Sequence, residues 1–216
     1  MEMDFSDESI KKAKNEFKSH SKGDGKRGPF YKNSEWIFNK ENGLLFENAV
    51  WQGYLDASRT FHNVDTVNRR AFNNLAGKIQ NFFSEKEKFN HEGWCDGFIK
   101  DVKNYNNYEC RYGQAQKVVN MAFKYLYCCD GIDISKFAEC HMPLDQYTLA
   151  WYFAESGKYY LNWSYFDNTN YVNVQNDIKV ILKEKGQADI LAAELVIWNN
   201  IKDGFVDLKK QWSVAR

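Results

Sequence analysis

The sequence predicts an all-α globular fold, built as one domain over residues 1–216. Apolar residues recur at spacings of three and four along several long stretches, which is the pattern of a helix with one buried face. Only 2 Pro and 13 Gly occur in 216 residues, too few for an all-β sandwich with many tight turns. With 44% apolar and 17% aromatic residues the chain can bury a large core, which excludes global disorder.

The first helix is expected over residues 7–18. Ser6 is a good N-cap, and Asp7 and Glu8 place negative charge at the positive end of the helix dipole. A mobile basic loop is expected over residues 19–33, because Ser, Gly, Lys and Pro dominate that stretch. Residues 36–46 fit either a small hairpin or a loop that enters a helix near Leu45, and the spacing of the residues that follow favours the helix.

The rest of the chain predicts six more helices with short connections, for about eight in all. The expected segments are Val67–Phe83, Trp94–Tyr105, Gly113–Cys129, Pro143–Glu155, a helix capped by Thr169 or Asn170 and ended by Gly186, and a last helix from Ala188 through Ile201. The residues expected to be among the best buried are Leu75, Ile79, Val118, Ala122, Leu126 and Leu149.

The five cysteines predict reduced, structural thiols in a cytoplasmic protein. Their number is odd, Cys128 and Cys129 are adjacent, and the N-terminus lacks the apolar stretch of a secretory signal. No C-x-x-C spacing occurs, which argues against zinc-ribbon and thioredoxin-type sites. Neither a metal nor a cofactor is expected, although the following residues offer a conceivable metal site: His91, Cys95, Cys140 and His141. No run of 18 apolar residues occurs, so no membrane association is expected.

The charge of the chain is balanced, with 29 Lys and Arg against 29 Asp and Glu, which argues against a protein that coats nucleic acid by bulk charge. Positive charge is nevertheless concentrated between Lys11 and Lys32. This segment is either a solvated loop or an arm whose Lys26 and Arg27 contact phosphates. Gly25-Lys26 is not a phosphate-binding loop of the nucleotide-binding type, because the preceding glycine spacing is missing.

Candidate chemistry lies in residues 108–151. Lys117 is expected in the first turn of a helix that begins at Gly113, and Asp145 in the first turn of a helix opened by Pro143. The helix dipole would lower the pKa of Lys117 slightly and keep Asp145 ionised, and such a pair suits nucleophilic chemistry by an amine. The ordinary interpretation is a solvated lysine near the surface and a capping aspartate.

This segment resembles the helix-hairpin-helix DNA glycosylases, particularly the 8-oxoguanine glycosylases and their archaeal-type relatives. In that family a hairpin glycine leads into a helix that carries a catalytic lysine, and a P-x-D element carries a catalytic aspartate at the next helix start. Gly113-Gln114-Ala115-Gln116-Lys117 and Pro143-Leu144-Asp145 match that order over about forty residues. The chain departs from the family in having one hairpin glycine rather than two, and it lacks the iron–sulfur cysteines of some members.

The resemblance implies an enzyme that removes a damaged base from double-stranded DNA through a Schiff base on Lys117, with Asp145 stabilising the cationic sugar. The rival lysine is Lys124, two helical turns further on. The residues expected to contact phosphate or DNA are Gly113, Gln114, Gln116 and His141, and His141 could share the site of Asp145. The candidates for a base pocket are Trp151, Trp198 and Trp212. A monomer is expected.

Two other functions compete with this one. The chain could be a non-catalytic all-α module that binds nucleic acid, or a small-ligand or interaction protein of bacterial type in which residues 113–151 are merely core. The discriminating observation is geometric: a glycosylase requires the Lys117 amine and the Asp145 carboxylate to face one cleft, within several ångströms of each other.

Overall fold

The computed structural model describes residues 3–21, 38–39, 43–64, 68–160 and 162–214. Within these ranges the fold is all-α, as predicted. The α-helices are α1 (Asp7–Ser21), α2 (Phe46–Ala57), α3 (Arg70–Phe83), α4 (His91–Asn106), α5 (Tyr112–Tyr127), α6 (Gln146–Ser156), α7 (Asn168–Glu184) and α8 (Ile190–Val214). Three short 3-10 helices are η1 (Ser58–Thr60), η2 (Ile134–Phe137) and η3 (Trp163–Tyr165).

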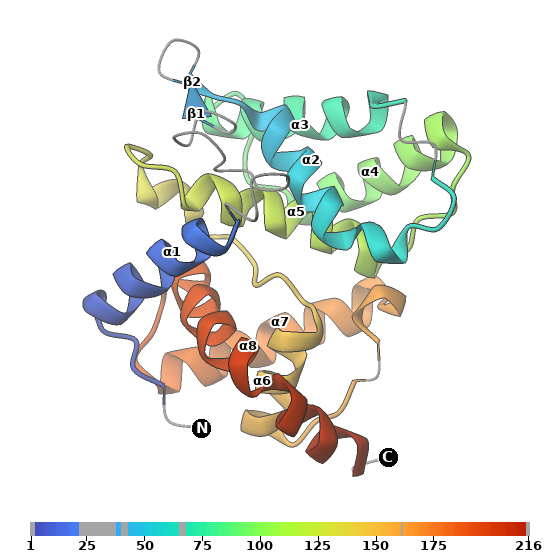
Figure 1. The fold of residues 1–216 in the computed structure, drawn as a ribbon. Helices are drawn as coiled ribbons and strands as arrows, with labels where there is room; N and C mark the ends of the chain where they lie inside the picture. The colour runs from blue at the N-terminus through green and yellow to red at the C-terminus, as the bar shows by residue number, and fades with distance from the viewer. Residues whose placement is uncertain (1–2, 22–37, 40–42, 65–67, 161, 215–216) are drawn as a thin grey trace.

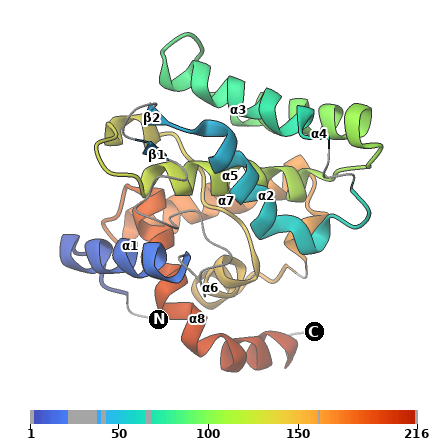
Figure 2. The same ribbon diagram turned by 45° about the horizontal axis from the view of Figure 1, so that its top comes forward.

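Helix α5 lies at the centre of the molecule, and each of its residues is buried. Helices α2, α3 and α4 pack over one side of it, and α1, α6 and α8 gather below the other side (Figures 1 and 2). A helix in this position has no solvated face, so its polar side chains must find partners inside the protein. Lys117 and Lys124 of this helix are therefore interior residues.

Helices α2 and α5 touch through their backbones. A Cβ atom at Gly53 of α2 would lie 2.5 Å from the carbonyl oxygen of Val118, closer than real Cβ contacts allow. Glycine at this position lets the two helices approach, and it brings the last turn of α2 over the middle of α5. Asp56 lies in that last turn.

Both structures expected around residues 36–46, the small hairpin and the helix that starts near Leu45, are present. A two-residue antiparallel pair joins β1 (Phe38–Asn39) to β2 (Gly43–Leu44), with Phe38 opposite Leu44, and α2 starts immediately afterwards. The first helix extends to Ser21, beyond the predicted end at Lys18. The rest of the predicted loop over residues 19–33 lies outside the described residues, as do Lys26 and Arg27.

Two predicted helix starts were wrong by several residues. Helix α6 begins at Gln146 rather than Pro143, because Asp145 is its N-cap: Asp145 Oδ1 accepts hydrogen bonds from the backbone N–H groups of Tyr147 (2.8 Å) and Thr148 (3.0 Å). Helix α7 is capped by Asp167, whose side chain accepts from Asn170 N, rather than by Thr169 or Asn170. In both cases a carboxylate just before the helix satisfies free N–H groups of the first turn.

The predicted core is confirmed, because all six residues expected to be well buried have at most 2% exposure. The five cysteines are free and buried, as expected for structural thiols. Burial raises the pKa of Cys128 and of Cys129 to about 12, so both thiols stay protonated at neutral pH. None of the described helices has the length and apolar character that a membrane span requires.

Candidate functional site

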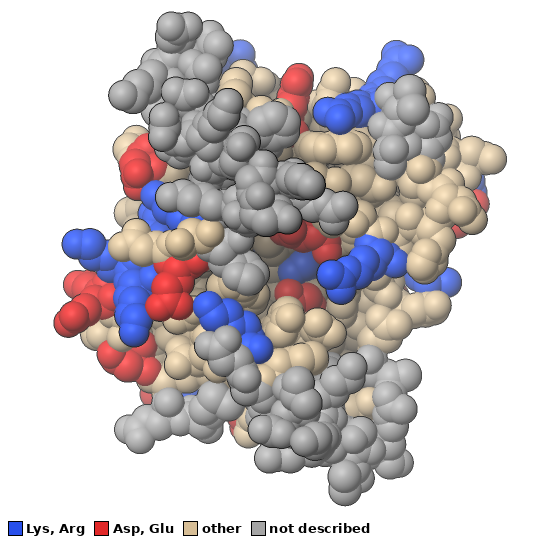
Figure 3. Space-filling view, viewed as in Figure 1, with Lys and Arg blue, Asp and Glu red and all other residues tan. Residues whose placement is uncertain are grey.

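A cavity of about 960 Å³ opens between α2, α5, α6 and α8, and both predicted catalytic residues line it. Its charged wall residues are Asp56, Arg59, Lys117, Lys124 and Asp145. Its aromatic wall residues are Phe17, Tyr125, Tyr147, Trp163 and Trp198. Figure 3 shows acidic and basic atoms meeting in a recess near the middle of this face of the molecule. Charged groups of both signs at the bottom of a cavity with aromatic walls are typical of a ligand site rather than of a solvated surface.

Lys117 and Asp145 form an ion pair on the wall of this cavity. The Nζ atom of Lys117 lies 2.7 Å from Oδ2 of Asp145, and the two side chains are 5% and 14% exposed. The other carboxylate oxygen, Oδ1, caps α6. The cap therefore fixes the carboxylate, and Oδ2 is turned towards the lysine. The Lys117 amine and the Asp145 carboxylate therefore face one cavity within hydrogen-bond distance of each other.

The environment of Lys117 differs from the predicted one. Lys117 lies in the second turn of α5, because the helix begins at Tyr112, and it is buried rather than near the surface. Burial by itself disfavours the ammonium, but the charge and hydrogen bond of Asp145 outweigh it, so the pKa of Lys117 is raised rather than lowered. Burial likewise opposes ionisation of Asp145, yet the Lys117 ammonium and the N–H of Thr148 hold its pKa below the ordinary value. At neutral pH the pair is ammonium and carboxylate.

Lys124, which is buried, and Asp56, which is exposed, also line the cavity, and only Lys124 was predicted from the sequence as part of the site. Lys124 lies 2.5 Å from Glu194 of α8, each with a side chain 1% exposed, and the Lys124 ammonium lies 4.1 Å from the centre of the Phe17 ring. Asp56 of α2 accepts a hydrogen bond of 2.7 Å from the Tyr125 hydroxyl. Burial raises the pKa of Glu194. Lys124 thus pairs with Glu194, and the Tyr125 hydroxyl holds the Asp56 carboxyl at the cavity wall.

Sequence reasoning missed Asp56 and Glu194 because each lies far along the chain from residues 108–151. The one available signal was an acidic residue inside an otherwise apolar helical stretch: Asp56 in α2, and Glu194 among the apolar residues 190–197. Glu194 is buried and needs a partner, which Lys124 of α5 supplies, whereas Asp56 is exposed and accepts its hydrogen bond from the Tyr125 hydroxyl.

The predicted phosphate contacts of Gly113, Gln114 and Gln116 are not supported by the geometry. The N–H of Gly113 donates to the carbonyl oxygen of Phe166 (2.9 Å), and a Cβ at this position would lie 2.0 Å from the carbonyl oxygen of Trp163. Glycine at this position lets η3 pack against α5 and does not serve to bind a phosphate. Gln114 and Gln116 are buried, and their side chains bond backbone groups at Thr60 and Leu144 respectively. All three residues hold neighbouring segments onto α5.

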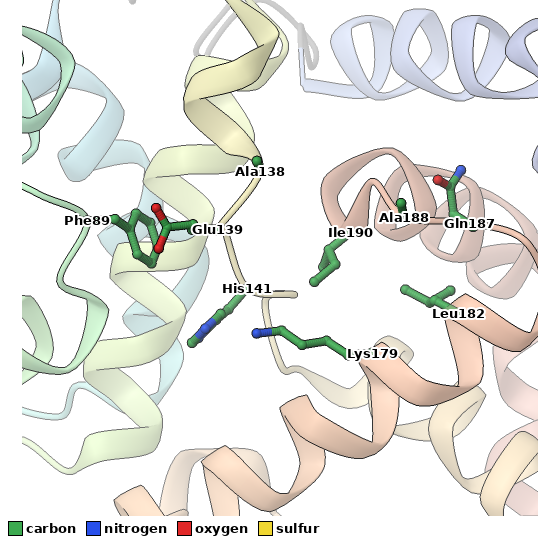
Figure 4. A pocket seen from close by; sticks show the side chains of 9 residues that line it. All are labelled: Phe89, Ala138, Glu139, His141, Lys179, Leu182, Gln187, Ala188 and Ile190. Carbon is green, nitrogen blue, oxygen red and sulfur yellow. The ribbon is translucent and has the colours of Figure 1, made fainter.

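His141 does not share the site of Asp145, contrary to the prediction. Its side chain lines a separate pocket of about 390 Å³, where the amine end of Lys179 lies beside it (Figure 4). The Nδ1 atom of His141 lies 2.9 Å from the Tyr171 hydroxyl, which also receives a hydrogen bond from the Asn120 amide (2.9 Å). The Nε2 atom of His91 lies 3.1 Å from the same hydroxyl. His141 thus belongs to a buried polar network that joins α5 to α7.

Trp151 and Trp198, both predicted as candidates for a base pocket, lie in different surroundings. Trp151 is fully buried and is not part of the cavity wall, so it is a core residue. Trp198 lines the cavity, but the ammonium groups of Lys124 and Lys202 lie 5.2 Å and 4.8 Å from its ring centre, so its faces carry cations rather than standing open for a base. Trp163 of η3 lines the cavity and was not predicted. The side chain of Trp212 lies outside the described residues.

Within the described ranges, no group of three or more His, Cys, Asp or Glu residues is arranged to hold a metal ion. His91 and Cys95 do lie together, with the sulfur 3.8 Å from each ring nitrogen, but His91 Nε2 is hydrogen-bonded to Asn120 (2.9 Å). Comparison with family models, with curated proteins and with solved structures finds no match to this chain.

Proposed function

We propose that this chain is a DNA-repair-type glycosylase and lyase that removes a damaged base through a Schiff base on Lys117. The observation that carries the proposal is the 2.7 Å contact between Lys117 and Asp145 on the wall of a cavity of about 960 Å³. Ligand sites commonly occupy about 300–1,000 Å³, so the cavity has room for a nucleotide flipped out of a duplex. The aromatic side chains of Tyr147 and Trp163 line it and offer ring faces for a base.

The resting charges of the pair favour a reaction in which the glycosidic bond breaks first. The base leaves C1′ with the bonding electron pair, and the Asp145 carboxylate stabilises the positive sugar that remains. The Lys117 ammonium gives its proton to the departing base, which converts the lysine to the neutral amine. The amine then forms a bond to C1′.

The lyase half of the reaction follows from the same two groups. The nitrogen bonded to C1′ loses a proton to Asp145, the sugar ring opens, and its ring oxygen takes that proton as the Schiff base forms. Asp145 then takes a proton from C2′, a C2′–C3′ double bond forms, and the 3′ phosphate leaves with the electron pair of its C–O bond, which cleaves the strand. The carboxylate thus serves as electrostatic stabiliser first and as proton carrier afterwards.

A second candidate is a protein that binds a small ligand without chemistry. It is favoured by the state of the two lysines, since each is paired with a carboxylate and the pKa of Lys117 is raised. In that case the paired charges would select a polar or aromatic ligand, and no bond would break.

The test is an excision assay on duplexes that each carry one modified base, namely an oxidised purine, an alkylated purine or uracil. Wild-type protein is compared with Lys117→Arg, which keeps the cation beside Asp145 but cannot supply a neutral amine. Lys183→Arg, at an exposed site on α7, is the matched control. We expect base release and strand cleavage from at least one duplex by wild type and control, and none by Lys117→Arg at unchanged thermal stability. Release by Lys117→Arg at the wild-type rate, or by no protein on any duplex, overturns the proposal.

A further inference from the structure

Arginine and lysine play different parts in this protein. Every ion pair in the part of the chain that the structure describes uses a lysine, and none uses an arginine. The four described arginines are Arg59, Arg69, Arg70 and Arg111, and all four are exposed. Their guanidinium groups therefore have no carboxylate partner among the described residues, although the whole chain carries as many acids as bases.

Three of these arginines are stacked on aromatic rings. The guanidinium of Arg69 lies 3.9 Å from the ring centre of Trp51, and that of Arg111 lies 3.8 Å from the ring centre of Tyr165. Arg70 lies 4.8 Å from the ring centre of Tyr105. A guanidinium held over a ring is restrained in position, and because these arginines are exposed their N–H groups are available for bidentate binding of a phosphate.

The segments that carry the arginines are bonded to one another. The carbonyl oxygen of Thr60, next to Arg59, accepts hydrogen bonds from Tyr108 (3.1 Å) and from Gln114 (2.5 Å). Gln114 in turn accepts from the backbone N–H of Arg111 (2.9 Å).

A second link joins the start of α3 to the end of α4. Asn68 donates to the carbonyl oxygen of Tyr105 (2.9 Å), and Asn106 donates back to that of Asn68 (2.8 Å). In Figure 1 the ends of α2 and α4 and the starts of α3 and α5 meet on the right-hand side of the molecule. The four residues thus form one surface, which we call the arginine rim.

The described carboxylates close to the rim arginines along the chain are bonded to other side chains. Asp56, three residues before Arg59, accepts a hydrogen bond from the Tyr125 hydroxyl (2.7 Å). Glu109 is the carboxylate nearest to Arg111 along the chain, and it is paired with Lys103 (2.8 Å). Asp101 of α4 accepts a hydrogen bond from the Asn74 side chain of α3 (3.0 Å). On the right-hand half of the face in Figure 3, basic side chains accordingly stand out with few acidic neighbours, whereas the left-hand part mixes both signs.

The rim adjoins the cavity directly, because Arg59 belongs to both. We propose that the arginine rim binds the phosphodiester backbone of DNA and holds one strand across the mouth of the cavity. This inference rests on the proposed function, and it supplies the phosphate contacts that Gly113, Gln114 and Gln116 do not make. DNA is the partner because oriented guanidinium forks beside a nucleotide-sized cavity suit regularly spaced phosphates.

The test measures the affinity for an undamaged 20-base-pair duplex by fluorescence anisotropy over a series of salt concentrations. The rim variant is Arg59→Gln, Arg69→Gln, Arg70→Gln and Arg111→Gln combined. The control removes the same charge elsewhere, at four exposed lysines: Lys86→Gln, Lys88→Gln, Lys179→Gln and Lys183→Gln. Each phosphate contact contributes about −0.9 to the slope of log K against log salt, so the rim variant should lose about 3 to 4 units of slope. The control should lose less than about one unit.

Equal loss in both variants, or no salt-dependent binding by the wild type, overturns the arginine rim as a DNA site. Tighter binding of heparin or single-stranded RNA than of duplex DNA by the wild type overturns DNA as its partner. The outcome is separable from that of the proposed function, since Lys117→Arg should bind the duplex as wild type does. A chain that binds DNA through the rim but releases no base would retain this inference and refute the glycosylase.

Discussion

Replacing Lys117 by Ala should lower the free energy of unfolding by far more than is expected for the solvated lysine that the sequence predicts. The Asp145 side chain is only 14% exposed and would remain ionised without its closest cation. Removing one partner of a buried ion pair typically costs about 3–5 kcal/mol. We expect a loss near the lower end, about 3 kcal/mol, because Asp145 keeps its hydrogen bonds from the N–H groups of Tyr147 and Thr148. A lysine at the surface would instead cost within about 0.5 kcal/mol.

The pH dependence identifies the ion pair as the cause. In the wild type, the pKa of Asp145 is lowered and that of Lys117 is raised. The contribution of the pair is therefore present from about pH 4 to about pH 10, and it is lost as the pH falls through the folded pKa of Asp145 or rises through that of Lys117. Without the lysine, burial dominates and raises the pKa of Asp145, so the carboxyl can be protonated in mild acid. The cost of Lys117→Ala should then shrink between pH 7 and pH 4.

The assay is urea unfolding of the wild type, Lys117→Ala and the double variant Lys117→Ala/Asp145→Asn at both pH values. The double variant removes the buried charge and keeps an N-cap, so it should recover more than about 1 kcal/mol at pH 7 relative to Lys117→Ala. A cost below about 1 kcal/mol that is independent of pH would refute the reasoning, because it would mean that Lys117 is solvated.

Two further predictions concern residues that the sequence assigned to the site. His141 has its pKa lowered to about 4 by burial and by the nearby Lys179, whereas in the unfolded chain it titrates near 6.5. Proton uptake by the unfolded state should therefore reduce stability as the pH falls from about 6.5 to about 4, and NMR titration of its ring signals should show a neutral imidazole at pH 6; a charged ring at that pH would contradict the buried network. Gly113→Ala should destabilise by about 1–3 kcal/mol and alter the fluorescence of Trp163, because its Cβ would lie 2.0 Å from the Trp163 carbonyl oxygen. Gly77→Ala in α3 is the control, as nothing lies within 4 Å of a Cβ there; equal stability of the two variants would argue against the close contact of η3.

The sequence predicts the helices well because their apolar spacing is strong. The residues expected to be buried on α3 and α5, such as Leu75 and Val118, are in the core. Helix starts were less accurate at Pro143 and Asn170, where a carboxylate two or three residues away is the N-cap instead. Local sequence does not say which of two neighbouring polar residues will satisfy the free N–H groups.

The site was predictable only in part. The order of Gly113, Lys117 and Asp145 brought the lysine and the aspartate together correctly, because a helix interior and the cap of a following helix can converge. The polar residues of α5 gave no sign that the helix is buried on all sides. For this reason the pKa of Lys117 was expected to be lowered although it is raised, and Gly113 was expected to contact phosphate although it contacts η3. The contribution of Asp56 depends on the backbone contact at Gly53, a tertiary feature without a local signal.

The proposed reaction requires a bond between the Lys117 amine and C1′ of a damaged nucleotide. The most direct measurement is borohydride reduction of the protein during reaction with a duplex that it cleaves, followed by mass spectrometry of the peptide that carries the sugar. We expect one adduct, on the peptide containing Lys117, and none in Lys117→Arg. An adduct on Lys124, or one of equal yield spread over exposed lysines, would contradict it.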